Sequence, residues 1–323
     1  MPVYNAERTV LGAARSVLDS TFENLELIIV DDGSTDATRK ILSSIRDPRT
    51  RVLRQSHEGI VAALNSGVTA AQAPFIARMD ADDESHPDRF TLQMQLLQCG
   101  ETDMAGSRVS IVDPTGQPVT SMRRYEEWIN QHCSADEIAA LRFVESPFVH
   151  PTVTARREVF ELGYRTGDFP EDYDLWLRAI KAGFRAVKLP RRLLRWTESP
   201  NRLTRRDCRY RPEAFDRCKR EHLREGPLDR VATVDLWGAG QTGKPWLRWL
   251  QKNSVTVRRL YDIDPNKLGQ SIHGVRVDHA DDLLPADGIV LLIAVGAEGA
   301  RELIKAAINS KGYRPGTDAW FLA

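Results

Sequence analysis

The sequence has few cysteines, no long apolar run and no excess of charge of either sign. Its four cysteines are scattered along 323 residues without Cys-x-x-Cys spacing, which argues against a disulfide framework or a zinc site and predicts reduced thiols. No stretch of about 18 apolar residues is present, so no segment is predicted to span a membrane. Lys plus Arg and Asp plus Glu number 45 each, and this balance gives no indication of nucleic-acid binding.

The N-terminus and one basic segment indicate where in the cell the protein is expected. The first residues contain no charged segment followed by an apolar core, so no signal peptide is predicted. Together with the reduced cysteines, this predicts a cytoplasmic protein. Residues 185–224 are rich in arginine, and such a segment can face phosphates or the anionic inner surface of a membrane, or can form solvated helix faces. We therefore expect membrane contact, if any, to be peripheral.

The first half of the chain alternates between strand and helix patterns. The predicted elements are helices at 9–18, 35–45 and 59–71, strands at 25–30 and 51–54, and a strand that leads to Asp80. This alternation predicts an α/β fold with a mostly parallel sheet and helices on its faces. In such sheets, ligands bind beyond the carboxyl ends of the strands.

Two acidic motifs lie at those strand ends. Asp31-Asp32-Gly33-Ser34 follows the strand at 25–30, and Asp80-Ala81-Asp82-Asp83 follows the apolar stretch at 74–77. Crowded carboxylates repel one another unless a cation lies among them. Mg²⁺ or Mn²⁺ fits, because such ions take oxygen ligands from carboxylates and from substrate phosphates. The pattern predicts a metal-diphosphate site, and the alternative is a solvated acidic turn.

Several motifs in order resemble the family 2 glycosyltransferases, which have the GT-A fold. The motifs lie at residues 1–5, 30–36, 63–67, 80–83, 150–153 and 171–178. The resemblance covers roughly residues 1–205. It implies an enzyme that moves a sugar from a nucleotide-diphosphate donor to an acceptor hydroxyl with inversion at the sugar carbon.

The resemblance assigns roles to individual residues at the donor end of the site. Pro2, Val3 and Tyr4 are similar to the first nucleotide-contacting loop. Asp32 is similar to the residue that accepts a hydrogen bond from the base, usually uracil, and a charged acceptor makes the stronger bond. Asp80 resembles the carboxylate near the ribose.

The same resemblance assigns the reacting groups. Asp82 is similar to the metal ligand that bridges to the diphosphate, and Asp172 matches the general base. Apolar neighbours around Asp172 would raise its proton affinity toward useful base strength. Its neighbours Glu171 and Asp174 could exchange roles with it, and all three could simply complement a helix dipole. Further expected substrate contacts are Glu171, His150 and Arg202, although His150 could equally pack and hydrogen-bond before a strand.

Two departures from the family pattern affect this site. The family normally has an apolar strand directly before the motif at residues 1–5, so we expect either a truncated start or a missing central strand. Loss of that strand would expose neighbouring backbone groups. Relatives often have a histidine in the loop where this chain reads residues 195–201, and Arg202 or Arg205 could serve in its place.

A second domain is predicted after a linker at residues 225–227, so the expected domains are 1–227 and 228–323. Gly238, Gly240 and Gly243 follow a strand and open a helix, and Asp262 ends the next strand. This spacing is typical of a Rossmann dinucleotide site that could bind NAD(P). Pro245 stands where a P-loop needs Ser or Thr, which argues against a P-loop. The segment resembles small Rossmann-like modules attached to sugar-modifying enzymes, with a nucleotide- or sugar-binding role or a structural or oligomerising role.

Together these features predict a metal-dependent inverting glycosyltransferase that uses a UDP-sugar in polysaccharide or cell-surface glycan synthesis. The acceptor would be a glycan or a lipid-linked glycan, selected by loops between residues 106 and 145. Two other functions fit parts of the chain. One is an NAD(P)-binding oxidoreductase that uses the C-terminal domain, and the other is a degenerate nucleotide-sugar-binding module.

Overall fold

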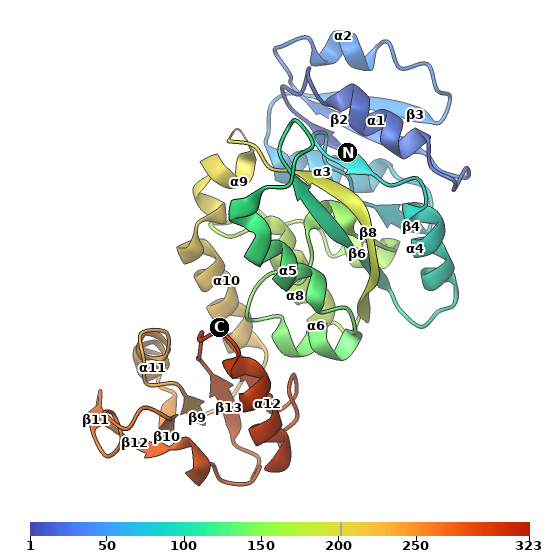
Figure 1. Ribbon diagram of the computed structural model, residues 1–323. Helices are drawn as coiled ribbons and strands as arrows, with labels where there is room; N and C mark the ends of the chain where they lie inside the picture. Colours follow the sequence, from blue (N-terminus) through green and yellow to red (C-terminus); the bar gives the residue numbers. More distant parts are fainter. Residues whose placement is uncertain (201) are drawn as a thin grey trace. The chain divides into compact units, whose positions relative to one another are not determined.

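The computed structural model describes residues 1–200 and 202–323, and its contacts divide the chain into two compact units (Figure 1). The N-terminal unit comprises Met1–Ala135 and Pro147–Cys218, and the C-terminal unit comprises Asp136–Ser146 and Lys219–Ala323. The division falls within helix α10 (Pro212–Glu225). The predicted domain boundary after residue 227 stays a prediction. Asn201, the last residue of the loop compared with relatives, lies outside the described residues.

A three-stranded parallel sheet forms the first part of the N-terminal unit. Its order is β1 (Pro2–Val3), β2 (Leu27–Asp32), β3 (Thr50–Gln55). Helices α1 (Val10–Leu18), α2 (Thr38–Leu42) and α3 (Ile60–Ala70) follow these strands in turn. Every residue of β2 is buried, because Leu27 and Ile29 pack with the α1 side and Ile28 and Val30 pack with α3. Successive side chains of a strand point to opposite faces, so α1 and α3 cover opposite faces of this sheet.

A five-stranded mixed sheet forms the rest of the N-terminal unit. Its order is β4 (Phe75–Ala77), β7 (Thr154–Arg156), β6 (Met104–Val112), β8 (Ala186–Thr197), β5 (Glu84–Ser85). Only β6 and β8 pair in parallel, while β4, β5 and β7 pair antiparallel with their neighbours. Its helices are α4 (Arg89–Gln98), α5 (Arg123–Gln131), α7 (Arg157–Glu161), α8 (Glu171–Lys181) and α9 (Leu203–Arg206). The predicted α/β class is therefore confirmed, with one parallel and one mixed sheet.

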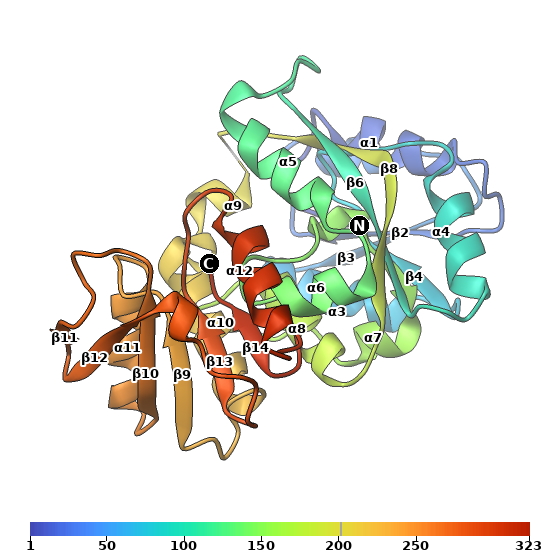
Figure 2. The same ribbon diagram turned by 60° about the horizontal axis from the view of Figure 1, so that its bottom comes forward.

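The C-terminal unit has a Rossmann-like sheet of six strands, with α11 (Gly243–Lys252) and α12 (Ala300–Ser310) on its two sides (Figures 1 and 2). The order is β11 (Ser271–Ile272), β12 (Val275–His279), β10 (Thr256–Asp262), β9 (Thr233–Trp237), β13 (Val290–Ile293), β14 (Ala319–Phe321). All neighbours pair in parallel except β11 and β12. This confirms the predicted Rossmann-like α/β fold of the second domain.

One segment of this unit was not expected from the sequence. Helix α6 (Ala135–Leu141) and the residues after it belong to the C-terminal unit from Asp136 to Ser146. Phe143 meets Trp320 edge to face with ring centroids 5.6 Å apart, and the Arg142 guanidinium lies 4.4 Å from the centroid of a Trp320 ring. The stretch from 106 to 145 is thus largely built into β6, α5 and α6 instead of forming long loops.

Membrane-spanning helices are absent from the described part of the chain: none of its helices combines the necessary length with the necessary apolarity.

Candidate functional site

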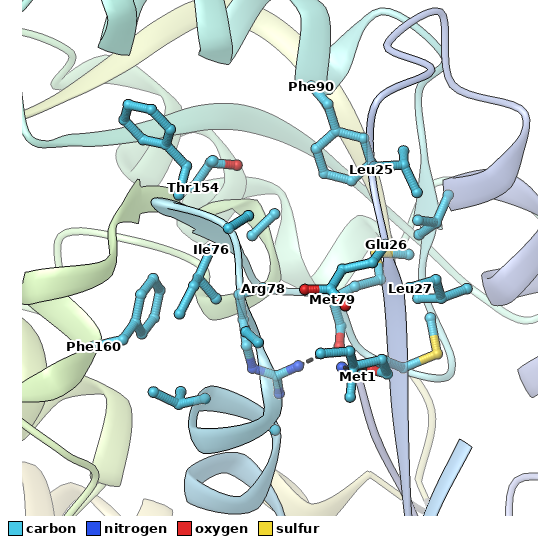
Figure 3. Close-up of a pocket in the computed structure, with 18 of the residues that line it drawn as sticks. Met1, Leu25, Glu26, Leu27, Ile76, Arg78, Met79, Phe90, Thr154 and Phe160 are labelled. Carbon is cyan, nitrogen blue, oxygen red and sulfur yellow. Dashed lines mark hydrogen bonds between the residues drawn. The ribbon is translucent and has the colours of Figure 1, made fainter. Parts of the chain in front are cut away.

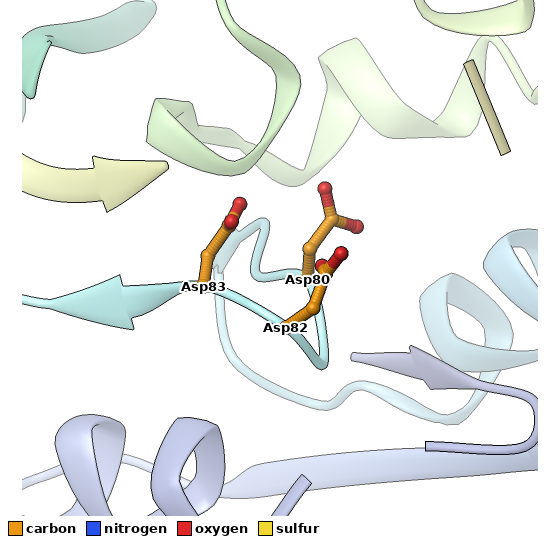
Figure 4. Close-up of side chains that lie close together, drawn as sticks. All are labelled: Asp80, Asp82 and Asp83. Atoms are coloured by element: carbon orange, nitrogen blue, oxygen red, sulfur yellow. The ribbon is translucent and has the colours of Figure 1, made fainter. Parts of the chain in front are cut away.

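The acidic turn after β4 holds three carboxylates close together. Ligand oxygens of Asp80, Asp82 and Asp83 lie within 4.8 Å of one another (Figure 4). The turn is short because β4 ends at Ala77 and β5 begins at Glu84. Burial raises the pKa of Asp82 and raises that of Asp83 well above its usual range. Among the residues that the structure describes, no hydrogen-bond partner reaches the buried Asp83 Oδ2. This donor set fits a hard divalent cation such as Mg²⁺ or Mn²⁺.

Arg202 lies inside this turn. Its guanidinium nitrogens lie 3.1 Å from a carboxylate oxygen of Asp83, 3.6 Å from one of Asp80 and 3.8 Å from one of Asp82. The side chain is only 7% exposed, donates to the Thr197 carbonyl at 2.7 Å and stacks over the Trp196 ring at 4.7 Å. Arg202 therefore offsets part of the negative charge from within the chain. Arg202, a predicted substrate contact, thus lies against the acidic turn.

A buried hydrogen-bonded chain supports Asp80. Arg78, 5% exposed, donates to Asp80 Oδ1 at 2.5 Å and to His150 Nε2 at 3.1 Å. The Tyr164 hydroxyl lies 2.8 Å from the same His150 nitrogen. Burial and the charge of Arg78 lower the pKa of His150 well below its usual range, so the neutral ring can accept a hydrogen bond from Arg78 Nε. Burial alone would raise the pKa of Asp80, but Arg78 and Arg202 outweigh it and the pKa is lowered. His150 thus holds Arg78, and its role as a substrate contact stays a prediction.

Asp172 lies at the start of α8, which begins directly after Pro170. Burial, and next the charge of Glu171, raise the pKa of Asp172 to about 8. The charges of Arg78 and Asp80 have smaller effects on this pKa, so Asp172 lies within electrostatic reach of Asp80. Its Oδ1 accepts a hydrogen bond from the Tyr173 amide at 2.7 Å. A carboxylate with this pKa can take a proton from a hydroxyl near neutral pH.

The two acids beside Asp172 are held by other groups. Asp174 is 1% exposed and accepts from Arg165 Nε at 3.0 Å and from Arg178 Nε at 2.9 Å. Its carboxylate is therefore engaged by two guanidinium groups, which argues against an exchange of roles with Asp172.

Glu171 is 3% exposed, and the Tyr210 hydroxyl lies 2.8 and 2.7 Å from its two oxygens. Burial raises the pKa of Glu171. Tyr210 lies 39 residues further along the chain, so nothing in the sequence near Glu171 indicated this partner.

At the predicted base-binding end, the chain itself engages the Asp32 carboxylate. Asp32 is 3% exposed. Its Oδ1 accepts from Gln55 Nε2 at 2.7 Å and the Glu58 amide at 3.0 Å, and its Oδ2 accepts from the Gly59 amide at 2.9 Å and lies 2.9 Å from His57 Nδ1. Asp32 therefore fixes residues 57–59, which follow β3. An N–H group of a nucleotide base would have to share or replace one of these hydrogen bonds to reach the carboxylate.

Tyr4 is the exposed member of the predicted nucleotide loop. Pro2 and Val3 are buried in β1, whereas Tyr4 is 45% exposed. Its ring stacks on His57 with centroids 4.0 Å apart and an interplanar angle of 21°. Because Asp32 also contacts His57, the stacked pair lies beside the carboxylate. His57 is a residue that the sequence analysis missed, since only the folded chain brings it to Tyr4.

The glycines of the predicted C-terminal nucleotide site make close backbone contacts, and their role in binding stays a prediction. A Cβ on Gly243 would lie 1.7 Å from the Gly238 carbonyl oxygen, and one on Gly238 would lie 2.5 Å from the Ala294 carbonyl oxygen. Asp262 Oδ2 accepts from the Ala239 amide at 2.8 Å and from Lys267 Nζ at 3.2 Å. Asp262 therefore fixes the backbone of the glycine loop at Ala239. A Cβ on Gly240 would make only an ordinary contact, 3.7 Å from Lys267 Nζ.

The arginine-rich segment is extensively paired within the N-terminal unit. The ion pairs are Arg192–Glu126 at 3.0 Å, Arg195–Glu84 at 2.8 Å, Arg205–Glu198 at 2.6 Å and Arg209–Asp207 at 2.7 Å. These pairs favour the interpretation as solvated and structural charges over a free cationic surface.

Comparison with known proteins identifies the family. The glycosyl transferase family 2 model matches residues 1–163, and the CoA binding domain model matches residues 229–314. The putative glycosyltransferase EpsE of Bacillus subtilis is 30% identical over 220 residues, which cover 65% of this chain and 76% of EpsE. The O-antigen biosynthesis glycosyltransferase WbnJ of Escherichia coli is 26% identical over 185 residues, which cover 56% of this chain and 70% of WbnJ.

A solved structure shares the fold. S. aureus TarS 1-349 in complex with UDP-GlcNAc matches with a TM-score of 0.55 at 17% identity, over 71% of this chain and 66% of TarS 1-349. The chain thus spans just under two thirds of that solved chain. At this level of identity the likeness shows the fold alone. The chain belongs to glycosyl transferase family 2, with a GT-A-like fold and a C-terminal domain of the CoA-binding type.

Proposed function

We propose that this glycosyltransferase is metal-dependent and inverting, and that it moves a sugar from a UDP-sugar to an acceptor hydroxyl of a glycan or lipid-linked glycan. The single observation that carries the proposal is the cluster of the Asp80, Asp82 and Asp83 carboxylates, with Asp172 within electrostatic reach of Asp80. The names of the relatives support glycan synthesis, since WbnJ is an O-antigen biosynthesis enzyme. The UDP-GlcNAc complex of TarS supports a uridine donor.

Each residue of the site has a chemical task in this proposal. Asp82, with Asp80 and Asp83, would hold Mg²⁺ or Mn²⁺, which acts as a Lewis acid toward the departing diphosphate. Arg202 can donate to phosphate oxygens from beside the turn, as a guanidinium suits phosphate. Tyr4, with Pro2 and Val3 behind it, would stack on the base, and Asp32 would accept from it.

The proton moves to Asp172. Asp172 Oδ takes the proton of the acceptor hydroxyl while that oxygen forms its bond to the anomeric carbon and the bond to the diphosphate breaks. A single displacement by the acceptor oxygen inverts the configuration at the anomeric carbon. Retention would need a second carboxylate that forms a covalent glycosyl-enzyme intermediate, and this proposal uses one base and no such nucleophile. Burial, and next the negative charge of Glu171, which Tyr210 holds, keep the pKa of Asp172 high.

Calorimetric titration of the full chain with UDP and with NAD, each with and without Mn²⁺, tests the proposal. We expect metal-dependent UDP binding, followed by UDP release from one member of a panel of UDP-sugars once an acceptor glycan is supplied. Binding of NAD alone would instead support the oxidoreductase function, and binding of neither nucleotide would support a degenerate module.

A second candidate function concerns the C-terminal domain. Its match to the CoA binding domain and its assembled glycine loop support binding of a nucleotide-containing cofactor there, by Gly238, Gly240, Gly243 and Asp262. The same titration with CoA, NAD and NADP would detect it, and Gly240→Leu should abolish that binding without affecting UDP. Cytoplasmic location, peripheral membrane contact and homo-oligomer formation stay predictions.

A further inference from the structure

Two neighbouring acids at the start of α8, Glu171 and Asp172, are here called the acid pair, and they differ in exposure and in bonding. Glu171 is 3% exposed, whereas Asp172 is half-buried. Asp172 accepts a hydrogen bond at 2.7 Å from the amide of Tyr173, the next residue of the same helix. Glu171 is instead held by a segment outside the helix. An acceptor hydroxyl can therefore reach Asp172 more readily than Glu171.

The Tyr210 hydroxyl bridges the Glu171 carboxylate, since it lies 2.8 Å from Oε1 and 2.7 Å from Oε2. Burial, and next the charge of Glu171, raise the pKa of Tyr210 well above its usual range, so the hydroxyl keeps its proton and donates it to the hydrogen bond. Hydrogen bonds to the charged form of a carboxyl group favour that form. Tyr210 thus stabilises the anion of Glu171 against burial, which raises the pKa of Glu171.

Tyr210 is fixed in place by the short helix η3 (Cys208–Tyr210). Asp207 caps this helix by accepting from the Arg209 amide at 2.9 Å. The same carboxylate accepts from Arg209 Nε at 3.1 Å and Nη2 at 2.7 Å. Held in this way, Arg209 has its Nη1 4.0 Å from Glu171 Oε2. The helix therefore presents both a hydroxyl donor and a positive charge to Glu171.

Three further groups act on the acid pair: Arg78, Asp80 and Tyr164. Arg78 lies in the wall of a cavity of about 310 Å³ in the N-terminal unit (Figure 3), and its charge lowers the pKa of both acids. The charge of Asp80 raises the pKa of the second acid. Burial raises the pKa of Tyr164, which is therefore neutral. Because Arg78 acts on both acids in the same direction, Tyr210 and Arg209 are the groups that distinguish them.

We propose that Tyr210 is a positioning residue that keeps Glu171 as the anion and thereby leaves the proton of the acid pair on Asp172. The inference rests on the proposed function, because it concerns the base of that reaction. An anion at Glu171 disfavours a second negative charge at Asp172, so Asp172 binds a proton more tightly and is the stronger base. Without the Tyr210 hydroxyl, Glu171 would compete for this proton and Asp172 would be a weaker base.

The test compares Tyr210→Phe, Glu171→Gln and the double variant with the unmodified full chain. Carbon-13 NMR of labelled Asp and Glu carboxyl groups follows the two titrations separately, with resonances assigned from Asp172→Asn and Glu171→Gln. We expect Tyr210→Phe to raise the titration midpoint of Glu171 and to lower that of Asp172, each by at least about 1 pH unit. The control Tyr313→Phe removes a hydroxyl from the C-terminal unit and should change neither midpoint.

The double variant shows whether Tyr210 acts through Glu171. Glu171→Gln alone should lower the Asp172 midpoint, because it removes the same anion, and Tyr210→Phe should then lower it no further. The pH profile of sugar transfer by Tyr210→Phe should move to lower pH by the same amount as the Asp172 midpoint.

Unchanged midpoints in Tyr210→Phe would overturn the inference. An equally large change of the Asp172 midpoint in the Glu171→Gln background would also overturn it, because Tyr210 would then act independently of Glu171. A chain that transfers no sugar would contradict the proposed function, whereas the NMR titrations would still decide this inference, so the two failures are distinguishable.

Discussion

The Arg202 guanidinium lies 3.1 Å from Asp83 Oδ1, and the Asp83 side chain is fully buried. This pair anchors the loop after β8 to the acidic turn, because Asp83 Oδ1 also accepts from the Thr197 amide at 2.8 Å. A buried carboxylate with this partner depends on it, since an unpaired charge in the interior is costly.

Arg202→Gln should lower the free energy of unfolding by about 1–3 kcal/mol, because it leaves the buried Asp83 carboxyl group without its guanidinium donor. Urea denaturation measures this, and added Mn²⁺ should restore part of the loss by neutralising the same turn. The matched control is Arg205→Gln, whose exposed pair with Glu198 predicts a change within about 1 kcal/mol. Equal losses for both variants would contradict a special role for Arg202.

Asp172→Asn should reduce transfer activity, whereas Asp174→Asn should reduce stability. Asp172→Asn removes the base, so transfer should fall at least about 100-fold while UDP affinity stays close to that of the unmodified chain and Tm does not fall. Asp174→Asn breaks the contacts with Arg165 and Arg178, so stability should fall by about 3 kcal/mol. Steady-state kinetics and thermal melting separate the two. Full turnover by Asp172→Asn would remove that residue from the base role.

The pKa of Asp172 predicts a pH dependence of stability. The folded chain holds this proton up to about pH 8, whereas the unfolded carboxyl loses it near its ordinary value of 3.8. Between these values the unfolded state binds fewer protons, so this group lowers stability as pH rises, by up to about 1.4 kcal/mol per unit. Urea denaturation from pH 5 to 8 should show a steeper decline for the unmodified chain than for Asp172→Asn.

Asp113→Asn is the control for this pH series. A hydrogen bond from Thr115 lowers the pKa of Asp113, so this group is already ionised above pH 5 in both states. The variant should therefore have the same pH slope as the unmodified chain between pH 5 and 8. Transfer activity should rise with pH toward 8, since the base works in its ionised form.

Tyr4→Ala should weaken UDP binding without destabilising the fold. Loss of a stacking surface costs about 1–3 kcal/mol of affinity per base, and Tyr4 is 45% exposed, so its removal leaves no core cavity. Calorimetry and thermal melting of Tyr4→Ala and of Tyr4→Phe, which keeps the ring, check this. Unchanged affinity in Tyr4→Ala would place the base elsewhere.

The parts of the site that could be predicted are those encoded by neighbouring residues. The apolar run at 74–77 predicts a strand, and Asp80-Ala81-Asp82-Asp83 directly after it predicts an acidic turn. The turn and its place at the end of a strand could therefore be predicted from local sequence. The glycine spacing around Gly238 similarly encodes a tight turn before a helix, and the structure has both.

The parts that could not be predicted depend on distant partners. The choice between Asp172 and Asp174 rests on Arg165 and Arg178, and only the Arg178 contact has a helical spacing that the sequence displays. Tyr210 reaches Glu171 across 39 residues. The membership of α6 in the C-terminal unit rests on aromatic contacts such as Phe143 with Trp320, which no local pattern reveals.

The most direct test of the central claim is the linkage between Mn²⁺ and UDP. Free Mn²⁺ is followed by electron paramagnetic resonance during UDP titration of the unmodified chain, of Asp82→Asn and of the exposed control Glu84→Gln. A metal ion held between the acidic turn and the diphosphate predicts that UDP tightens Mn²⁺ binding at least about tenfold in the unmodified chain and in Glu84→Gln, and that Asp82→Asn abolishes this effect. Equal Mn²⁺ affinity with and without UDP, or an unaltered effect in Asp82→Asn, would contradict it.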